Sequence, residues 1–402
     1  MSSNFNISDA SVSNLAKRKY AQKSLNMYNG KVATLGLIKK TFGNVGERVE
    51  RAVPTGFQGG ASVGYLGTAN AAPYEKAYFT TKSVYTVAEI DGRTISQFKD
   101  EGAFVDGISE VMKKTVEKFN WLMNFLVTGG SDGKLGVVSS ATLISGVTWD
   151  LVITDASWVK ARWEVKEHVN IGDGNNDRFE ITAVTRSTKT VRVVRRTGSQ
   201  VPVAAHSVYI DGGYNASPEG IAGVFSANSG TKYGITVQDR WQAYQRAASS
   251  ATISPDLLND VVLGVIDNVG ISPTHLLTST LQVRKLMNSV EDQKRYSLSP
   301  TKLEPRASEL IGKVSFSGIE YMSPDGPIPI IIDRFLADDV VSAVNFDESE
   351  IAHSKQGWFD MEGFIFLRKA GADAYECRYG GYLENYFPPT VNGWLSGLST
   401  TV

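Results

Sequence analysis

Apolar side chains recur at helical spacing over residues 103–128, in steps of three and four. The members of this stripe are Phe104, Ile108, Val111, the methyl group of Thr115, Phe119, Leu122 and Leu126. Gly129 and Gly130 follow directly, and glycine takes the left-handed conformation that ends many helices. The pattern predicts a helix about 39 Å long, since each residue adds about 1.5 Å. We expect the stripe to be core, buried against a long sheet or a second helix.

Residues 48–95, just before this helix, have the pattern of a long β-hairpin. The strands are expected at residues 48–53 and 79–90, and both faces of the second strand carry apolar groups, so neither is simply solvated. The segment between them is rich in glycine and has too little apolar mass to fold on itself. Its tip residues are Phe57, Gly59, Gly60, Tyr65 and Leu66. The aromatic rings favour a tip that becomes ordered at a subunit interface; the alternative is a disordered surface loop.

The rest of the chain alternates between β-rich and mixed segments. Residues 147–215 hold short β-branched runs separated by turn residues, which predicts a small meander or barrel inserted after the helix. Residues 216–345 combine helical and strand patterns, which is typical of a compact α/β or α+β domain. Residues 346–402 return to β structure, with strands expected at 363–368 and 374–379.

The composition is that of an ordinary folded protein, with 402 residues, 42% hydrophobic and 21% charged. This length exceeds what one hydrophobic core usually supports, so we expect two or three. The single cysteine, Cys377, excludes an intrachain disulfide and a thiolate metal site. No apolar run approaches the roughly 18 residues of a membrane span, and the N-terminus lacks the apolar block of a signal peptide. We therefore expect a protein that stays in the cytoplasm where it is made.

The charge is unevenly distributed although the net charge is only −1. Residues 11–40 contain seven lysines and arginines and no acidic residue. Four of these, Lys17, Arg18, Lys19 and Lys23, are the candidates for a surface that faces nucleic acid or an acidic partner protein. The alternative is a solvated tail or helix face.

Neither a catalytic, a cofactor nor a metal site is predicted. Residues 129–133 fit the G-x-S-x-G form of hydrolases, but that motif lies between a strand and a following helix, whereas this segment follows a helix. Residues 173–177 open with the spacing of a calcium loop, but Arg178 and Val184 occupy the positions that need glycine and a bidentate glutamate. The four histidines are isolated from other metal-binding residues. We expect no enzymatic activity.

The order of these parts resembles that of the major capsid proteins of tailed bacteriophages. In that family a β-hairpin extension leads into a long spine helix, which ends in a glycine-rich loop like Thr128-Gly129-Gly130-Ser131-Asp132-Gly133. The resemblance implies an α+β fold with an N-terminal arm, an extended hairpin loop, a peripheral domain containing the spine helix, an axial domain and a β-rich insertion. The parts would be residues 1–47 (arm), 48–95 (hairpin loop), 96–146 (peripheral domain with spine helix), 147–215 (insertion), 216–345 (axial domain) and 346–402 (return strands of the peripheral domain and C-terminal tail).

The resemblance also implies a structural role. The chain would be the shell subunit of an icosahedral or prolate phage head, forming hexamers and pentamers around double-stranded DNA, and assembling in the bacterial cytoplasm. Its partners would be copies of itself, portal, scaffold and decoration proteins, and the packaged DNA, bound without sequence preference. Two alternatives stay open. One is the shell of an encapsulin-like bacterial nanocompartment, against which the basic arm and the β-rich insertion argue. The other is an enzyme whose distant residues converge without a sequence signal.

Overall fold

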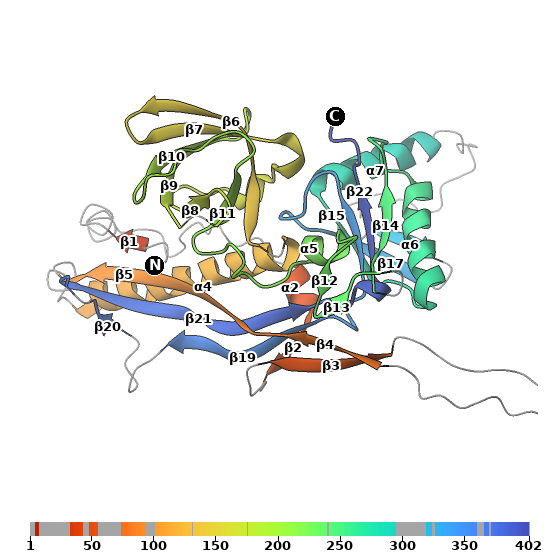
Figure 1. Ribbon diagram of the computed structural model, residues 1–402, viewed down its shortest axis with the longest axis horizontal. Helices are drawn as coiled ribbons and strands as arrows, with labels where there is room; N and C mark the ends of the chain where they lie inside the picture. Colours follow the sequence, from red (N-terminus) through yellow and green to blue (C-terminus); the bar gives the residue numbers. More distant parts are fainter. Residues whose placement is uncertain are drawn as a thin grey trace, which may run out of the picture.

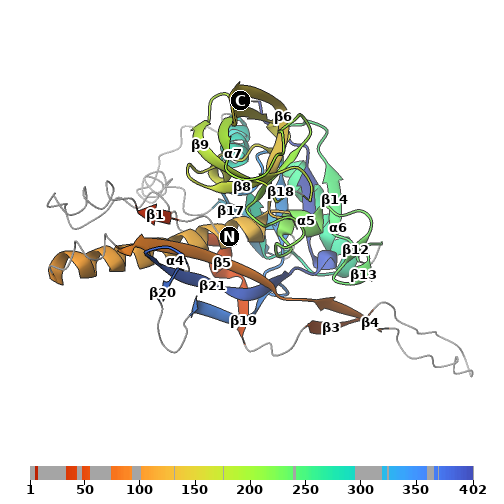
Figure 2. The ribbon, with the colours of Figure 1, turned by 60° about the vertical axis from the view of Figure 1, so that its left-hand side comes forward.

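The computed structural model describes residues 5–7, 33–42, 48–54, 74–92, 101–130, 132–174, 176–238, 241–294, 319–323, 326–359, 366–369 and 371–401. Three bodies make up this part of the chain: a long sheet covered by a helix, a closed β-barrel, and a second sheet with its own helices (Figure 1). The barrel and the second sheet lie on the helix side of the long sheet (Figure 2). The mixed α+β class predicted from the sequence is confirmed.

The long sheet combines strands from both ends of the chain. Its strands, in spatial order, are β1 (Phe5–Ile7), β5 (Lys82–Asp91), β21 (Ala374–Tyr386), β19 (Glu350–Phe359) and β2 (Lys39–Phe42), with β20 (Leu367–Arg368) beside β21. Helix α4 (Glu101–Thr128) lies along one face, close to the predicted span. Phe119 packs edge-on against Tyr379 of β21 with ring centroids 5.1 Å apart, and the Thr86 hydroxyl donates to the Thr115 carbonyl at 3.2 Å. The helix is therefore fixed to the centre of the sheet.

The hairpin differs from the one expected. Strand β3 (Val49–Pro54) pairs with β4 (Tyr74–Phe79), whereas β5 pairs with β21 in the long sheet. Most of the second strand predicted at residues 79–90 therefore belongs to the long sheet. The hairpin region expected at residues 48–95 thus includes a strand of that sheet. The physical reason is that β5 carries apolar groups on both faces and is buried from Thr86 to Ile90, as befits a central strand.

Part of the expected N-terminal arm also belongs to the packed structure. Helix α2 (Ala33–Leu37) and strand β2 lie within the range 1–47, and β2 pairs in parallel with β19. Thr34 and Ile38 are 1% and 3% exposed, respectively, because this segment packs into the main core. The arm interpretation is wrong for residues 33–42.

The barrel begins earlier than the insertion boundary expected at residue 147. Its strands are β6 (Lys134–Ser145), β7 (Thr148–Ile153), β8 (His168–Ile171), β9 (Arg178–Thr185), β10 (Thr190–Arg195) and β11 (Ser207–Ile210), and it closes in the order β10-β7-β6-β11-β8-β9. Gly146, at φ 51°, forms the turn that folds β7 back on β6. Strand β6 therefore belongs to the barrel rather than to the peripheral domain. The Ile210 amide donates to the Gly133 carbonyl at 3.1 Å, so the chain enters and leaves the barrel at adjacent points.

The second sheet draws on residues that the sequence assigned to two domains. Its strands, in order, are β14 (Tyr244–Ala247), β22 (Gly393–Ser396), β18 (Val341–Val344), β15 (His275–Thr278), β17 (Gly326–Ile332) and β16 (Ile319–Ser323); helices α6 (Pro255–Val269) and α7 (Thr280–Lys294) flank it. The tail was expected to end in the peripheral domain. Instead, the chain crosses through a short 3₁₀ turn at Pro389–Val391 and β22 pairs with β14 and β18, because Leu395 completes the apolar core around α6.

Candidate functional site

The β3–β4 hairpin projects beside one end of the long sheet (Figures 1 and 2). Residues 50–52 of β3 and 74–76 of β4 are exposed, and the Tyr74 ring is 65% exposed. A two-stranded ribbon is at best marginally stable alone in water. Its outer half is thus a surface that this chain leaves uncovered, while its base is held by the body.

The base of the hairpin is fixed by an aromatic cluster. Ala77 and Phe79 are buried, and the Phe79 ring stacks on Tyr386 at 5.5 Å and meets Tyr233 edge-on at 6.0 Å. The Tyr78 amide donates to the Tyr233 carbonyl at 2.8 Å. Strand β4 is therefore attached both to the end of β21 and to the turn between β12 (Thr231–Lys232) and β13 (Ile235–Thr236).

Gly234 allows this attachment for two separate reasons. Its φ of 78° lies in the left-handed region, which disfavours residues that carry a Cβ. A Cβ at this position would also lie 2.1 Å from the Tyr78 ring. Only glycine fits here without displacing the Tyr78 ring.

An ionic contact ties the other strand of the hairpin to the edge of the long sheet. Arg51 of β3 donates from Nε to Glu350 Oε1 at 3.1 Å, and its Nη2 also contacts that oxygen. The second oxygen of Glu350 accepts from the Thr41 hydroxyl of β2 at 2.8 Å. Glu350 is 8% exposed, so this contact joins β2, β3 and β19 in a partly dry environment.

On the outward face of the hairpin, basic and acidic side chains pair with one another. Glu50 accepts from Lys76 at 3.0 Å and from Arg48 at 2.7 Å, and these hydrogen bonds, that of Lys76 first, lower the pKa of Glu50. The Arg48 guanidinium also lies 3.9 Å from the centre of the Tyr78 ring. Such exposed pairs contribute little stability, and they leave the ribbon without a strong net charge.

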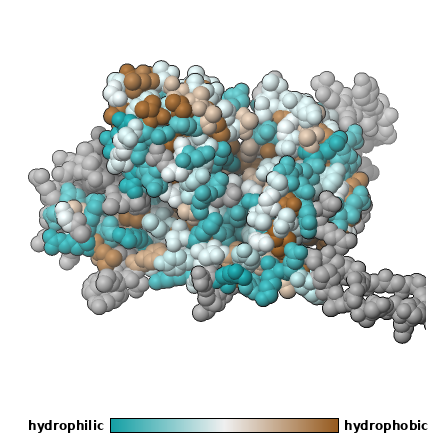
Figure 3. Space-filling view, viewed as in Figure 1, coloured by the Kyte–Doolittle hydropathy of each residue, from teal (hydrophilic) through white to brown (hydrophobic). Residues whose placement is uncertain are grey.

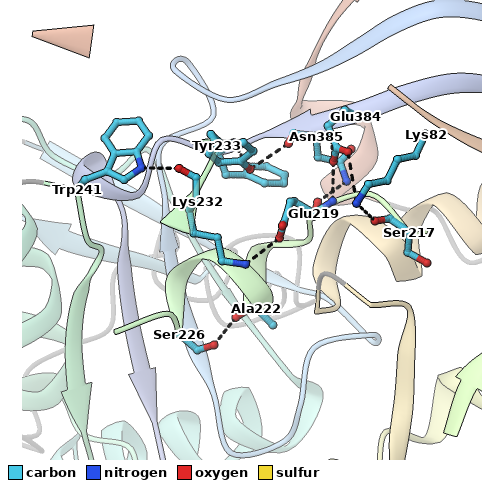
Figure 4. Close-up of polar contacts among 11 residues, drawn as sticks. Lys82, Ser217, Glu219, Ala222, Ser226, Lys232, Tyr233, Trp241, Glu384 and Asn385 are labelled. Atoms are coloured by element: carbon cyan, nitrogen blue, oxygen red, sulfur yellow. Dashed lines mark hydrogen bonds and ion pairs between the residues drawn. The ribbon is translucent and has the colours of Figure 1, made fainter. Parts of the chain in front are cut away.

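A buried polar junction holds the segment that carries Tyr233 and Gly234 (Figure 4). Glu384 of β21 is 2% exposed and accepts the Glu219 amide at 2.6 Å, while Asn385 Nδ2 donates to the Glu219 carbonyl at 2.7 Å. The Tyr233 hydroxyl donates to the Asn385 carbonyl at 3.0 Å. Burial raises the pKa of Glu384 to about 7, and it raises the pKa of Tyr233 well above its usual value. Three hydrogen bonds thus connect β21 to the support of the hairpin.

The predicted spine-helix residues occupy the following positions. Val111, Phe119 and Leu126 are 5%, 1% and 1% exposed, respectively, and Leu122 is half-buried. The backbones of Phe104 and Ile108 lie in α4, and their side chains fall outside the described residues. The predicted tip residues Phe57, Gly59, Gly60, Tyr65 and Leu66 and the basic residues Lys17, Arg18, Lys19 and Lys23 also lie outside the described residues.

A second cluster at the C-terminal end of α4 was not predicted from the sequence. Trp121 and Phe125 are buried on this helix, and the Trp121 ring meets Phe335 edge-on at 5.7 Å. Arg162, from the barrel, donates to the Phe335 carbonyl at 2.7 Å from Nη2 and 3.1 Å from Nε, and burial lowers its pKa to about 10. These contacts join α4, the barrel and the second sheet. The only sequence signal for them is that apolar residues of α4 extend beyond the predicted stripe.

The described surface of the body offers further apolar spots. The β6–β7 turn exposes Leu143, Ile144 and Val147, and Figure 3 shows apolar side chains gathered on the barrel in this view. Among the described residues, no group of three or more histidine, cysteine or acidic side chains could hold a metal ion. Within the same part of the chain, no helix is long and apolar enough to cross a membrane.

Comparison with known proteins identifies the fold. No protein-family model matches the chain, and no curated protein matches it. Among solved structures, the capsid asymmetric unit of cyanophage A-1(L) matches with a TM-score of 0.59 at 10% identity, covering 95% of this chain and 97% of that one. The chain has the fold of a phage capsid protein.

Other similar structures align over comparable lengths. An encapsulin complex from Synechococcus elongatus, the holo-SrpI complex, matches with a TM-score of 0.49 at 9% identity, covering 98% of this chain and 96% of that one. The capsid of a native GTA particle matches with a TM-score of 0.48 at 8% identity, covering 95% of each chain. At these identities the likeness shows the fold alone.

Proposed function

We propose that this chain is the structural subunit of a phage head, which assembles into capsomers and a closed shell around double-stranded DNA. The observation that carries the proposal is the hairpin: its base is fixed by the Phe79 cluster and the Arg51–Glu350 contact, while its outer half is exposed. A ribbon held so firmly and left uncovered is suited to lie on another molecule. The capsid-protein fold supports a second copy of this chain as that molecule.

The assembly role extends to the segment between the two strands. Residues 55–73 join β3 to β4, contain the five tip residues Phe57, Gly59, Gly60, Tyr65 and Leu66, and carry no charged side chain. Shell proteins need obligate interfaces of about 2,000–5,000 Å² or more. A tip that lies on an adjacent subunit, in hexamers and pentamers alike, adds interface area that the subunit cannot provide for itself.

The basic segment has a separate proposed role. Lys17, Arg18, Lys19 and Lys23 face the interior of the particle and contact phosphate groups of the packaged DNA or an acidic scaffold. Portal and decoration proteins are the further partners expected for a shell of this kind. The role of the chain is structural rather than enzymatic, and assembly takes place in the cytoplasm of the host.

The test is deletion of residues 59–64 from the tip. The free subunit should keep its thermal unfolding midpoint, because the tip is attached to a base that lies outside the deletion. Closed shells should be absent or fragile when the same protein is counted by electron microscopy. A control replaces the exposed Val165 and Val201 of the barrel with Ser, which changes apolar surface far from the hairpin in the fold without removing a turn. Normal shells from the tip deletion would contradict the assembly role, and an unfolded subunit would place the tip in the core.

A further inference from the structure

Strand β6 of the barrel is paired on both sides only in its first third. Strand β11 pairs with β6 from Lys134 to Val137, and the Ala205 amide then donates to the Val138 carbonyl at 2.8 Å. Beyond Val138, among the residues that the structure describes, β6 pairs with β7 alone. The outer edge of residues 139–145 therefore presents main-chain N–H and C=O groups with no strand beside them.

This outer edge is exposed, and its centre is regular. Register shifts against β7 fall at Ser139 and Ile144, so Ser140–Leu143 is a regular stretch between two bulges. Within it only Ala141 is half-buried, and Leu143 is 58% exposed. The ribbon of β6 and β7 lies on the side of the barrel away from the long sheet (Figure 1), and apolar side chains gather on the barrel (Figure 3). The stretch is thus accessible to a strand from outside.

The side chains of this edge lack the charges that usually protect an edge strand. Proteins commonly blunt exposed edges with charged residues, lysine above all, because a free edge invites pairing with another chain. Two other edge strands of this protein follow that rule, since β2 carries Lys39 and Lys40 and β16 carries Glu320. Residues 135–149, by contrast, contain no charged side chain. A strand added to β6 would therefore not bring an unpaired charge into the contact.

The same edge of a second copy fits this strand. When identical antiparallel strands pair about a two-fold axis, the residue at the axis lies opposite itself. With the axis at Thr142, the exposed Leu143 lies opposite Ala141 of the second copy, so a large side chain meets a small one. The two Thr142 side chains face each other, and such threonine pairs favour strand pairing. An axis at Ala141 would leave Leu143 outside the regular pairing.

We propose that the outer edge of β6 binds the same edge of a second copy, as an antiparallel strand pair centred on Thr142. Main-chain hydrogen bonds would then join the two barrels through one continuous sheet. The contact is small, so it is weak between two free subunits and gains strength when it is repeated across many copies. Its use between subunits of a shell rests on the proposed function; the pairing itself is a property of the barrel edge.

Cross-linking of introduced cysteines tests the pairing in the full chain, kept below the concentration at which shells form. Thr142→Cys places two thiols opposite each other, with Cβ atoms about 4.5–5.5 Å apart, so a short bismaleimide should join two chains. Ser140→Cys is the matched control on the same face of β6, because its two copies would lie four residues apart along the strand, about 14 Å. Both positions are exposed, so both variants should fold. The native Cys377 is 1% exposed and should not react.

The expected result is a covalent dimer that forms at least about tenfold faster with Thr142→Cys than with Ser140→Cys, because paired thiols have a millimolar effective concentration in a micromolar solution. Equal rates would mean random collision and would overturn the proposal. The absence of a dimer from either variant would also overturn it, and would leave a strand of a different protein as the occupant of the edge.

The same measurement in protein that lacks residues 59–64 separates this pairing from the proposed role of the hairpin tip. The dimer should form at an unchanged rate, since the β6 edge lies in the barrel and the deletion lies outside it. Loss of the dimer would overturn the proposal, because the tip would then be what brings the copies together. Failure of the β6 pairing leaves the shell role standing, and failure of the tip-deletion test leaves the pairing standing.

Discussion

Phe119 is the residue at which the apolar stripe of α4 meets the centre of the long sheet. It is 1% exposed and packs on Tyr379, so Phe119→Ala should lower the free energy of unfolding by about 3–5 kcal/mol. Phe119→Asp should give insoluble or degraded protein, because an unpaired charge would be buried. Chemical denaturation of the free subunit measures the first, and soluble yield measures the second. Leu263→Asp, at an exposed position of α6, is the control; a soluble Phe119→Asp subunit that assembles would contradict the core position.

Gly234 and Gly230 form a natural pair for testing the hairpin base. Both have a positive φ, 78° and 84°, but a Cβ meets the Tyr78 ring only at Gly234 and meets nothing within 4 Å at Gly230. Gly230→Ala should therefore lower the free energy of unfolding only by the backbone strain, about 1–2 kcal/mol. Gly234→Ala should lower the free energy of unfolding further, and it should also reduce the hydrogen-exchange protection of the Tyr78 amide. Equal effects of the two substitutions on Tyr78 would show that Gly234 does not support β4.

At the residue scale, hydrophobic periodicity predicted the burial of Phe119, but it could not predict the burial of Glu384. Phe119 belongs to a stripe that repeats over many turns of a helix, and each member reinforces the others. Glu384 is one acidic residue near the end of the 13-residue strand β21, and only the approach of residues from β5 and from the segment before α5 (Ile221–Phe225) makes its surroundings dry. Nothing in the local sequence records that approach.

The basic segment is the element whose predicted role is most open to a direct test. Replacing Lys17, Arg18, Lys19 and Lys23 with Gln should reduce packaged DNA or assembly yield while the unfolding midpoint of the subunit is unchanged. The expected loss reflects fewer phosphate contacts, so raising the salt concentration should have a similar effect on the wild type. Packaged DNA per particle and particle yield are the measurements.

The control for this set removes the same charge from the barrel, at Lys160, Lys166, Arg186 and Lys189. An equal loss of DNA from the control set would mean that net charge, rather than the N-terminal segment, is responsible. A structure of the particle with the four N-terminal side chains on the outer surface would also contradict the assignment.

Among the elements, long periodic segments were predicted well and strand partners were not. Helix α4 and the β-rich character of the insertion follow from patterns within a single segment. The pairing of β5 with β21 joins Thr86 to Tyr379, 293 residues apart, and the alternation along a strand does not say which other strand lies beside it. For the same reason β22 could not be assigned to the second sheet from its own four residues.

For the whole molecule, the adjacent ends of the barrel predict that it is a separable unit. Deleting residues 134–209 and joining Gly133 to Ile210 should leave a folded body of lower stability, since Arg162 no longer contacts Phe335. Residues 133–211 alone should fold around their own core, in which Trp158 stacks on Trp163 and Trp149 meets Phe179. Near-ultraviolet circular dichroism and thermal unfolding of both products check this. An unfolded fragment would show that the barrel depends on α4.

The pairing of β5 with β21 also affects the order in which parts of the nascent chain can fold. Strand β5 and helix α4 are made long before β21 (Ala374–Tyr386), the strand that completes their sheet. Until then, α4 lacks the Tyr379 surface that covers Phe119, whereas the barrel has all of its strands and can fold at once. A nascent chain therefore lacks a finished long sheet until β21 has been made, so the proposed docking of a hairpin from another copy would have to wait for that strand.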